Sequence, residues 1–139
     1  MKKDRDLTIN ENTAGDYWSA GEIFKEQLSN KDREIFAVLC LDTKGKPVCY
    51  SEVHVGTLNQ SLIHPREIFK VAILSNAHSI IVAHNHPSGN TTPSQQDISI
   101  TDTLVKASKV LNIPLLDHLI ISDTEMMSLR NKQPNLFDE

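Results

Sequence analysis

Residues 80–97 constrain the fold of this chain most, because they predict a buried strand, a turn and a helix start in succession. The apolar run Ile80-Ile81-Val82-Ala83 is typical of a buried strand. The segment 87–93 contains two prolines, one glycine, one serine and one asparagine, a composition that turns the chain. Ser94 and Asp97 then have the spacing of a capped helix N-terminus. A strand end and a helix start are therefore expected to face each other across a short turn.

Three candidate metal ligands lie in this window. His84 and His86 are two residues apart on the predicted strand, so both imidazoles lie on one face of it, and the turn can bring Asp97 back toward them. Three protein ligands leave the fourth tetrahedral position of Zn²⁺ open, as in hydrolytic zinc sites, where the metal lowers the pKa of water to about 7. Manganese or iron can use similar ligands, but two imidazoles and a carboxylate favour zinc. The sequence thus predicts a catalytic zinc site formed by His84, His86 and Asp97.

The same spacing resembles that of a known enzyme superfamily. His84-x-His86, seven residues, Ser94, two residues and Asp97 match the motif of the JAMM metalloproteases, also called JAB or MPN proteins, without gap or substitution. The surrounding words are similar to those of the RadC-type bacterial branch, notably His64-Pro65-Arg66-Glu67 and Leu116-Asp117-His118. The resemblance covers about residues 34–122. It implies an α/β (α+β) MPN fold in which a mixed β-sheet and helices form three layers, and a zinc-dependent hydrolase of amide or isopeptide bonds.

The resemblance also implies two catalytic residues. In JAMM enzymes a glutamate on an upstream strand deprotonates the metal-activated water and passes the proton to the leaving amine. By position this role falls to Glu34, which immediately precedes the apolar run 35–41. Glu52 and Glu67 stay open as alternatives, because the choice depends on a distance that the sequence does not give. The family's serine corresponds to Ser94, which is expected to support the oxyanion in addition to capping the helix.

Other polar residues near these positions are expected to be structural. Asn85, between the two histidines, should point to the opposite face and satisfy backbone groups. His118 has two interpretations: a residue that supports the ligands or contacts the substrate, and a histidine hydrogen-bonded within a strand without a catalytic role. The second is favoured. The ligand histidines need acceptors for their second ring nitrogens, and the sequence does not identify these acceptors.

The length and composition predict one domain. With 139 residues and 39% hydrophobic residues the chain can form one core but is too short for two. We expect a flexible N-terminal segment over residues 1–15, a single domain over 16–130 and a flexible tail over 131–139. Helices are predicted at about 17–29, 65–76 and 94–111, and strands at 35–41, 48–55, 80–86 and 115–121.

The chain is expected to act in the cytoplasm. No stretch is long and apolar enough to span a membrane, and residues 1–6 lack the apolar core of a signal peptide. Cys40 and Cys49 flank a predicted hairpin turn and are expected to be reduced thiols.

Charge bears on the choice of partner. The 14 basic and 18 acidic residues give a net charge of −4, which opposes nucleic-acid binding, so a protein or peptide substrate is expected. The letters His-Asn-His occur also in the HNH nucleases, but those enzymes spread their signature residues over a much longer ββα unit. The alternative is a DNA-repair-associated or protein-binding MPN module with little or no hydrolytic activity. Such inactive members typically lose the metal ligands, whereas all three are present here. The sequence does not indicate an oligomeric state.

Overall fold

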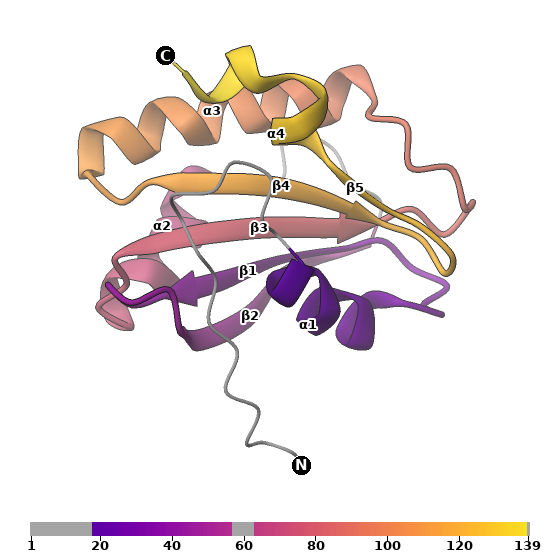
Figure 1. Cartoon of the computed structure of the whole chain (residues 1–139), viewed down its shortest axis with the longest axis horizontal. Helices are drawn as coiled ribbons and strands as arrows, with labels where there is room; N and C mark the ends of the chain where they lie inside the picture. The colour runs from indigo at the N-terminus through magenta and orange to yellow at the C-terminus, as the bar shows by residue number, and fades with distance from the viewer. Residues whose placement is uncertain (1–17, 57–62, 139) are drawn as a thin grey trace.

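A five-stranded mixed sheet forms the centre of the molecule (Figure 1). The computed structural model describes residues 18–56 and 63–138. The strand order is β2-β1-β3-β4-β5, in which β3 and β4 are parallel and the other neighbours antiparallel. The strands are β1 (Ile35–Leu41), β2 (Pro47–Val55), β3 (Ser79–Asn85), β4 (Leu115–Ile121) and β5 (Met126–Ser128). The helices are α1 (Trp18–Leu28), α2 (Pro65–Leu74), α3 (Gln95–Leu111), α4 (Leu129–Lys132) and the 3-10 helix η1 (Pro134–Phe137).

Helices cover both faces of the sheet, so the fold has three layers (Figure 1). On one face, Phe36 packs with Ile68 of α2 and Leu104 of α3. On the other face, Leu39 and Leu119 pack with Phe24 and the rest of the buried side of α1. This arrangement confirms the predicted α+β fold with a mixed sheet between helices. Within residues 18–56 and 63–138, no helix has the length and apolar composition needed to cross a membrane.

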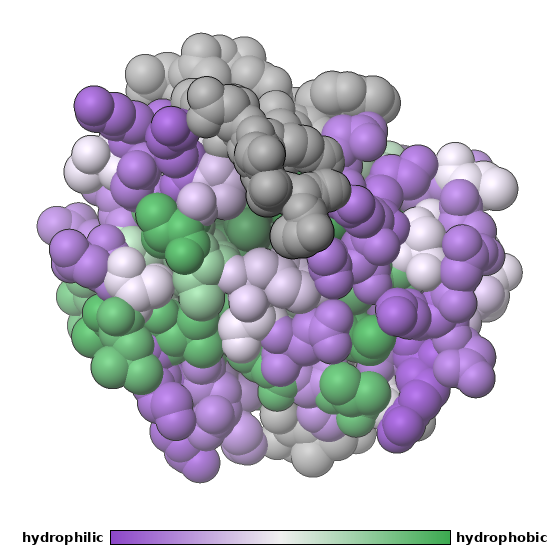
Figure 2. Space-filling view, turned by 90° about the horizontal axis from the view of Figure 1, so that it is seen from below, coloured by the Kyte–Doolittle hydropathy of each residue, from purple (hydrophilic) through white to green (hydrophobic). Residues whose placement is uncertain are grey.

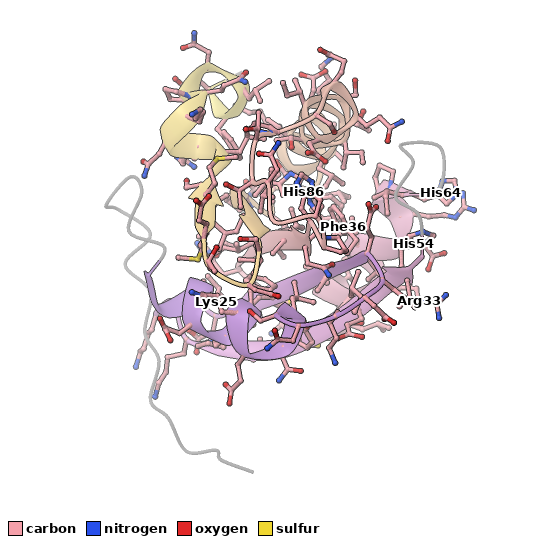
Figure 3. The ribbon with its side chains drawn as sticks, turned by 90° about the vertical axis from the view of Figure 1, so that its right-hand side faces the viewer. Lys25, Arg33, Phe36, His54, His64 and His86 are labelled. Carbon is pink, nitrogen blue, oxygen red and sulfur yellow. The ribbon has the colours of Figure 1, made fainter. Side chains whose placement is uncertain are left out.

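The two central strands, β1 and β3, are buried along their whole length. They run antiparallel, with Phe36 opposite His84, so the first residues of β1 lie beside the last residues of β3 at one end of the strands. Figure 3 looks onto this end of the strands, where His86, Phe36 and Arg33 are labelled. The strand β2 is the edge strand on the other side of β1. The face of the molecule that is seen from below is mostly hydrophilic, and its hydrophobic residues form separate groups (Figure 2).

The predicted elements agree closely with those of the structure. β1 and β4 have the predicted bounds, because apolar runs flanked by turn residues define both. Helix α2 ends two residues earlier than predicted. Asn76 has a φ of 57°, in the left-handed region that ends a helix.

The C-terminal segment differs from the predicted flexible tail over 131–139. Residues 129–132 and 134–137 form α4 and η1, and the side chains of Leu129 and Phe137 are buried. The guanidinium of Arg130 lies 5.4 Å from the centre of the Phe137 ring. These two buried side chains, together with hydrogen bonds from Arg130 to Asp117 and to the Leu116 carbonyl, hold the segment on the domain, and they leave no periodic pattern in the sequence. The predicted flexible segment over 1–15 lies outside the described residues.

Candidate metal centre

The structure brings His84, His86 and Asp97 together, and we call these three residues the candidate triad. The Nε2 atoms of the two histidines are 2.9 Å apart. Asp97 Oδ1 lies 3.1 Å from His84 Nε2, and Asp97 Oδ2 lies 3.5 Å from His86 Nε2. One ligand atom from each residue lies within 4.8 Å of the other two. This group could hold a metal ion.

Strand β3 and helix α3 position the candidate triad. His84 is in β3, and His86 follows the strand while its backbone N–H still donates to the Ile121 carbonyl of β4 over 2.8 Å. At the start of α3, Ser94 Oγ accepts the Asp97 N–H over 3.1 Å and Asp97 Oδ2 accepts the Ser94 N–H over 2.8 Å. This reciprocal capping box confirms the predicted helix start and fixes the Asp97 carboxylate in the first turn.

The candidate triad is nearly closed to solvent except at one residue. His84 and Asp97 are 0% and 1% exposed, whereas the side chain of His86 is 17% exposed. Burial raises the pKa of Asp97, but the hydrogen bonds with His84 and His86 outweigh it, so the pKa lies well below its usual range. The hydrogen bond to Asp97 raises the pKa of His86, against the opposite effect of burial. Asp97 is therefore ionised and gives the site a negative charge that favours a cation.

The chemistry of the donor set fits a zinc ion. His86 Nδ1 lies 2.6 Å from the Asn90 carbonyl oxygen, and a carbonyl only accepts, so this nitrogen carries the hydrogen. In the neutral ring His86 Nε2 then presents its lone pair to His84 and Asp97. When His84 Nε2 presents a lone pair as well, the two nitrogens and the carboxylate oxygen repel one another unless a proton or a cation lies between them. Imidazole nitrogen and carboxylate oxygen are ligands that Zn²⁺ prefers.

Glu34 lies at the same end of the strands, directly before β1. Phe36 pairs with His84, and continuing this antiparallel register by two residues brings position 34 level with position 86. Side chains two residues apart share a face, so Glu34 is expected on the face that carries Phe36 and the candidate triad. Glu34 is half-buried, and its charge contributes to raising the pKa of His86.

Asn85 holds the backbone on both sides of Glu34. Its Oδ1 accepts the Ile35 N–H over 2.6 Å, and its Nδ2 donates to the Arg33 carbonyl over 2.9 Å. The prediction that Asn85 faces away from the histidines and satisfies backbone groups is confirmed. The residue between the two histidines therefore fixes the segment that carries Glu34.

The two alternative glutamates have other surroundings. Glu52 lies opposite Ala37, whose side chain packs on the α1 face of the sheet, away from the candidate triad. Its carboxylate accepts the Tyr50 hydroxyl over 3.1 Å. Glu67, in the first turn of α2, is half-exposed and lies 3.9 Å from Arg66 Nε.

A cavity opens beside Glu34. It has a volume of about 350 Å³ and is lined by Asp32, Arg33, Glu34, Gly56 and Pro87. Gly56 has a φ of 124°, which side chains rarely adopt, and a Cβ there would meet no atom within 4 Å. Pro87, which directly follows His86, contributes to the wall of the cavity, so the cavity is formed in part by the loop that follows β3.

Two buried residues lie behind His84: His118, for which the sequence favoured a structural role, and Thr101, which the sequence did not indicate. His118 Nε2 lies 2.9 Å from His84 Nδ1, and His118 Nδ1 lies 2.6 Å from Thr101 Oγ1. The predicted structural role of His118 thus has a specific partner, one of the candidate ligands. His118 is opposite Val82, on the face of His84, and this register between β3 and β4 cannot be read from the sequence.

Comparison with known proteins identifies the family. The family model described as "RadC-like JAB domain" matches residues 16–134. The UPF0758 protein pc1765 of Protochlamydia amoebophila is 45% identical over 113 residues, which are 81% of this chain and 49% of that protein. The UPF0758 protein of Moorella thermoacetica is 49% identical over 107 residues, 77% of this chain and 47% of the relative. The chain spans about half the length of the curated relatives it matches.

Proposed function

The chain belongs to the RadC-like JAB domain family, and from this premise we propose that it is a zinc-dependent hydrolase that cleaves an amide or isopeptide bond. The observation that carries the proposal is the convergence of His84, His86 and Asp97, with ligand atoms all within 4.8 Å of one another. The names of the relatives state no activity, so the proposal depends on the chemistry of the site.

The three residues of the candidate triad would hold the ion through His84 Nε2, His86 Nε2 and a carboxylate oxygen of Asp97. Zinc supplies Lewis-acid chemistry, because it makes water acidic near neutral pH and polarises a carbonyl group. The burial of His84 and Asp97 keeps competing water from two sides of the site. The exposed edge of His86 is the side from which a substrate would approach.

Glu34 would act as the general acid and base. One of its carboxylate oxygens would take the proton of the attacking water and hold it until the leaving nitrogen accepts it. Its position beside His86 and the two hydrogen bonds of Asn85 to the neighbouring backbone support this role. The adjoining cavity gives a substrate access to the same carboxylate.

Ser94 would stabilise the oxyanion. Its hydroxyl oxygen accepts the Asp97 N–H, and this leaves the hydroxyl hydrogen free to be donated. The side chain is exposed at the start of α3, next to a ligand of the candidate site. Removing one oxyanion donor in other hydrolases typically costs about 3 kcal/mol of transition-state stabilisation.

A protein or peptide is the proposed substrate class. The net charge of −4 disfavours a polyanion, and the candidate triad with a general base is suited to adding water to a carbonyl. The proposal concerns this domain, since the relatives contain as much sequence again outside the matched region.

Metal analysis combined with variant enzymes tests the proposed function. The purified protein is expected to contain about one zinc per chain and to hydrolyse peptide or isopeptide members of a panel that also includes DNA. His86→Ala should lose the metal and the activity, whereas Glu34→Gln should keep the metal and lose at least about 100-fold in kcat. Glu52→Gln is the matched control and should behave as the wild type. Cleavage of DNA alone would overturn the peptidase assignment, and metal-free, inactive protein would favour a binding module.

A further inference from the structure

A chain of buried hydrogen bonds connects His84 to helix α3. His84 Nδ1 and His118 Nε2 are 2.9 Å apart, and His118 Nδ1 and Thr101 Oγ1 are 2.6 Å apart. Thr101 Oγ1 in turn lies 2.7 Å from the carbonyl oxygen of Asp97. The side chains of His84, His118 and Thr101 are all 0% exposed. None of these three side chains is therefore in contact with bulk water.

The acceptor at the end determines the direction of every bond. The Asp97 carbonyl has no hydrogen, so the Thr101 hydroxyl donates to it, as threonine commonly does to the residue four positions earlier in a helix. A hydroxyl has a single hydrogen, so Thr101 Oγ1 can only accept from His118 Nδ1–H. The neutral His118 ring then has a bare Nε2, which accepts from His84 Nδ1–H. His84 Nε2 is left with a lone pair that points at the candidate triad.

The reverse direction has a specific penalty. If Thr101 donated to His118 Nδ1, then His118 Nε2 would carry a hydrogen and donate to His84 Nδ1. His84 would then be protonated on Nε2 and could not bind a metal through that atom. Two oxygens, Thr101 Oγ1 and Asp97 O, would also face each other at 2.7 Å without a hydrogen between them. A buried pair of acceptors that face each other without a hydrogen is unfavourable, because neither oxygen is hydrogen-bonded.

The ring of Phe36 packs against both histidines of this chain of hydrogen bonds. Its ring stacks on His84 with centroids 6.0 Å apart and an interplanar angle of 10°, and it meets His118 edge-on at 5.6 Å. His118 is fully buried, so bulk water does not reach its ring. Water cannot replace a missing partner here, so a change at Thr101 is transmitted to His84.

We propose that Thr101 and His118 are positioning residues that fix His84 in the Nδ1–H tautomer and thereby raise the affinity of the site for zinc. The inference rests on the metal site of the proposed function and is independent of hydrolysis. The chain ends on the carbonyl of Asp97, whose carboxylate is itself a candidate ligand, so it links one ligand on β3 to another on α3. Metal-ligating histidines generally depend on such partners for orientation and tautomer.

Zinc affinity, measured by competition with a chromophoric chelator, tests the proposal. Thr101→Val keeps the size of the side chain but removes the hydroxyl, and it should weaken zinc binding by about 10- to 100-fold. Thr101→Ser restores the hydroxyl and should remain within about threefold of the wild type. Ser108→Ala is the matched control, because Ser108 Oγ also donates to a backbone carbonyl of α3, that of Val105, over 2.7 Å but is not a member of this hydrogen-bond chain. Equal affinities for Thr101→Val and Ser108→Ala would overturn the proposal.

Nitrogen-15 NMR of the histidine rings in metal-free protein gives a second readout that a purely structural role would not change. The wild type and Thr101→Ser should show His84 protonated at Nδ1, and Thr101→Val should lose this preference. A wild-type spectrum with the hydrogen on His84 Nε2 would overturn the proposed direction of the hydrogen bonds, whatever zinc affinities are measured. If the wild type binds no zinc but shows the expected tautomer, the proposed metal function fails, while the proposed direction of the hydrogen bonds between Thr101, His118 and His84 stands. A thermal unfolding curve of each variant verifies that it is folded.

Discussion

Asp97 connects the start of α3 to the candidate metal site through its two carboxylate oxygens. Oδ2 accepts the N–H of Ser94 and closes the capping box, while Oδ1 faces His84 Nε2. The helix dipole adds to this arrangement, since a negative charge in the first turn is favourable. The residue therefore has a stabilising role that does not need a metal, in addition to the proposed ligand role that does.

The two roles of Asp97 can be separated by substitution. Asp97→Asn keeps an oxygen for the Ser94 N–H but loses the charge, so it should reduce zinc affinity by more than about 100-fold with a small loss of stability. Ser94→Ala removes the other half of the capping box and should cost about 1 kcal/mol of unfolding free energy with zinc affinity unchanged. Chelator competition and urea unfolding measure the two quantities. If Ser94→Ala reduced zinc affinity as much as Asp97→Asn, the separation of the roles would be wrong.

His118 should make the metal-free protein sensitive to acid. Burial is the main cause that lowers its pKa in the folded state to about 3 from an ordinary value of 6.5. Between these values the unfolded chain binds the proton and the folded chain does not, so stability is lost as the pH falls from about 6.5 to about 3. The loss should amount to a few kcal/mol, on the order expected for a shift of this size.

Urea unfolding at a series of pH values, with a chelator present, measures this dependence. His118→Gln should have a shallower decline in unfolding free energy over the same range. His64→Gln is the control, because His64 is exposed and its side chain makes no capping hydrogen bond, and it should keep the wild-type slope. A wild-type slope in His118→Gln would assign the acid sensitivity to other groups.

At the scale of elements, the end of β3 uses both of its faces. His84 and His86 point to one face and belong to the candidate triad, while Asn85 between them bonds to the backbone that flanks Glu34 on β1. The alternation of one strand thus aligns the candidate ligands with the candidate base. A substitution at Asn85 should therefore affect Glu34 without removing a ligand.

Asn85→Ala is expected to lower the unfolding free energy by about 1–3 kcal/mol, because the buried Ile35 N–H loses its acceptor. It should also reduce kcat while the zinc content stays at the wild-type level, since His84 and His86 remain. Ser79→Ala, at the other end of β3, is the control. Ser79 Oγ is buried without a hydrogen-bond partner among the described residues, so its loss should be neutral or slightly stabilising. Loss of zinc from Asn85→Ala would show that this residue positions the ligands instead.

The sequence predicted local features well, including the hairpin of β1 and β2, but it left other contacts between distant segments open, for a physical reason. Apolar runs such as 35–41 and the capping pair Ser94 and Asp97 encode their structure within a few residues, and both were confirmed. The choice between Glu34 and Glu52 depends on which strand faces meet, as does the contact of His118 with His84. Register is set by contacts between residues far apart in the chain, so one sequence does not reveal it.

For the whole molecule, the site joins the central strand of the sheet to the long helix that covers it. His84 and His86 come from β3 and the loop that follows it, and Asp97 comes from α3. The three ligand atoms converge only in the folded chain, so zinc should bind the native state and not the unfolded state. Zinc binding is then coupled to the stability of the whole domain.

Zinc should accordingly raise the unfolding free energy of the entire domain rather than of one loop. At a free zinc concentration of 100 times Kd the expected gain is about 2.7 kcal/mol, and it should disappear on addition of a chelator. Thermal unfolding followed by far-ultraviolet circular dichroism, which reports on all helices and strands, would show a single transition that moves to higher temperature with zinc. His86→Ala should unfold at the same temperature with and without zinc, because it lacks one of the ligands. An equal upward shift in this variant would mean that zinc binds elsewhere on the protein, and the link between this site and the stability of the fold would be lost.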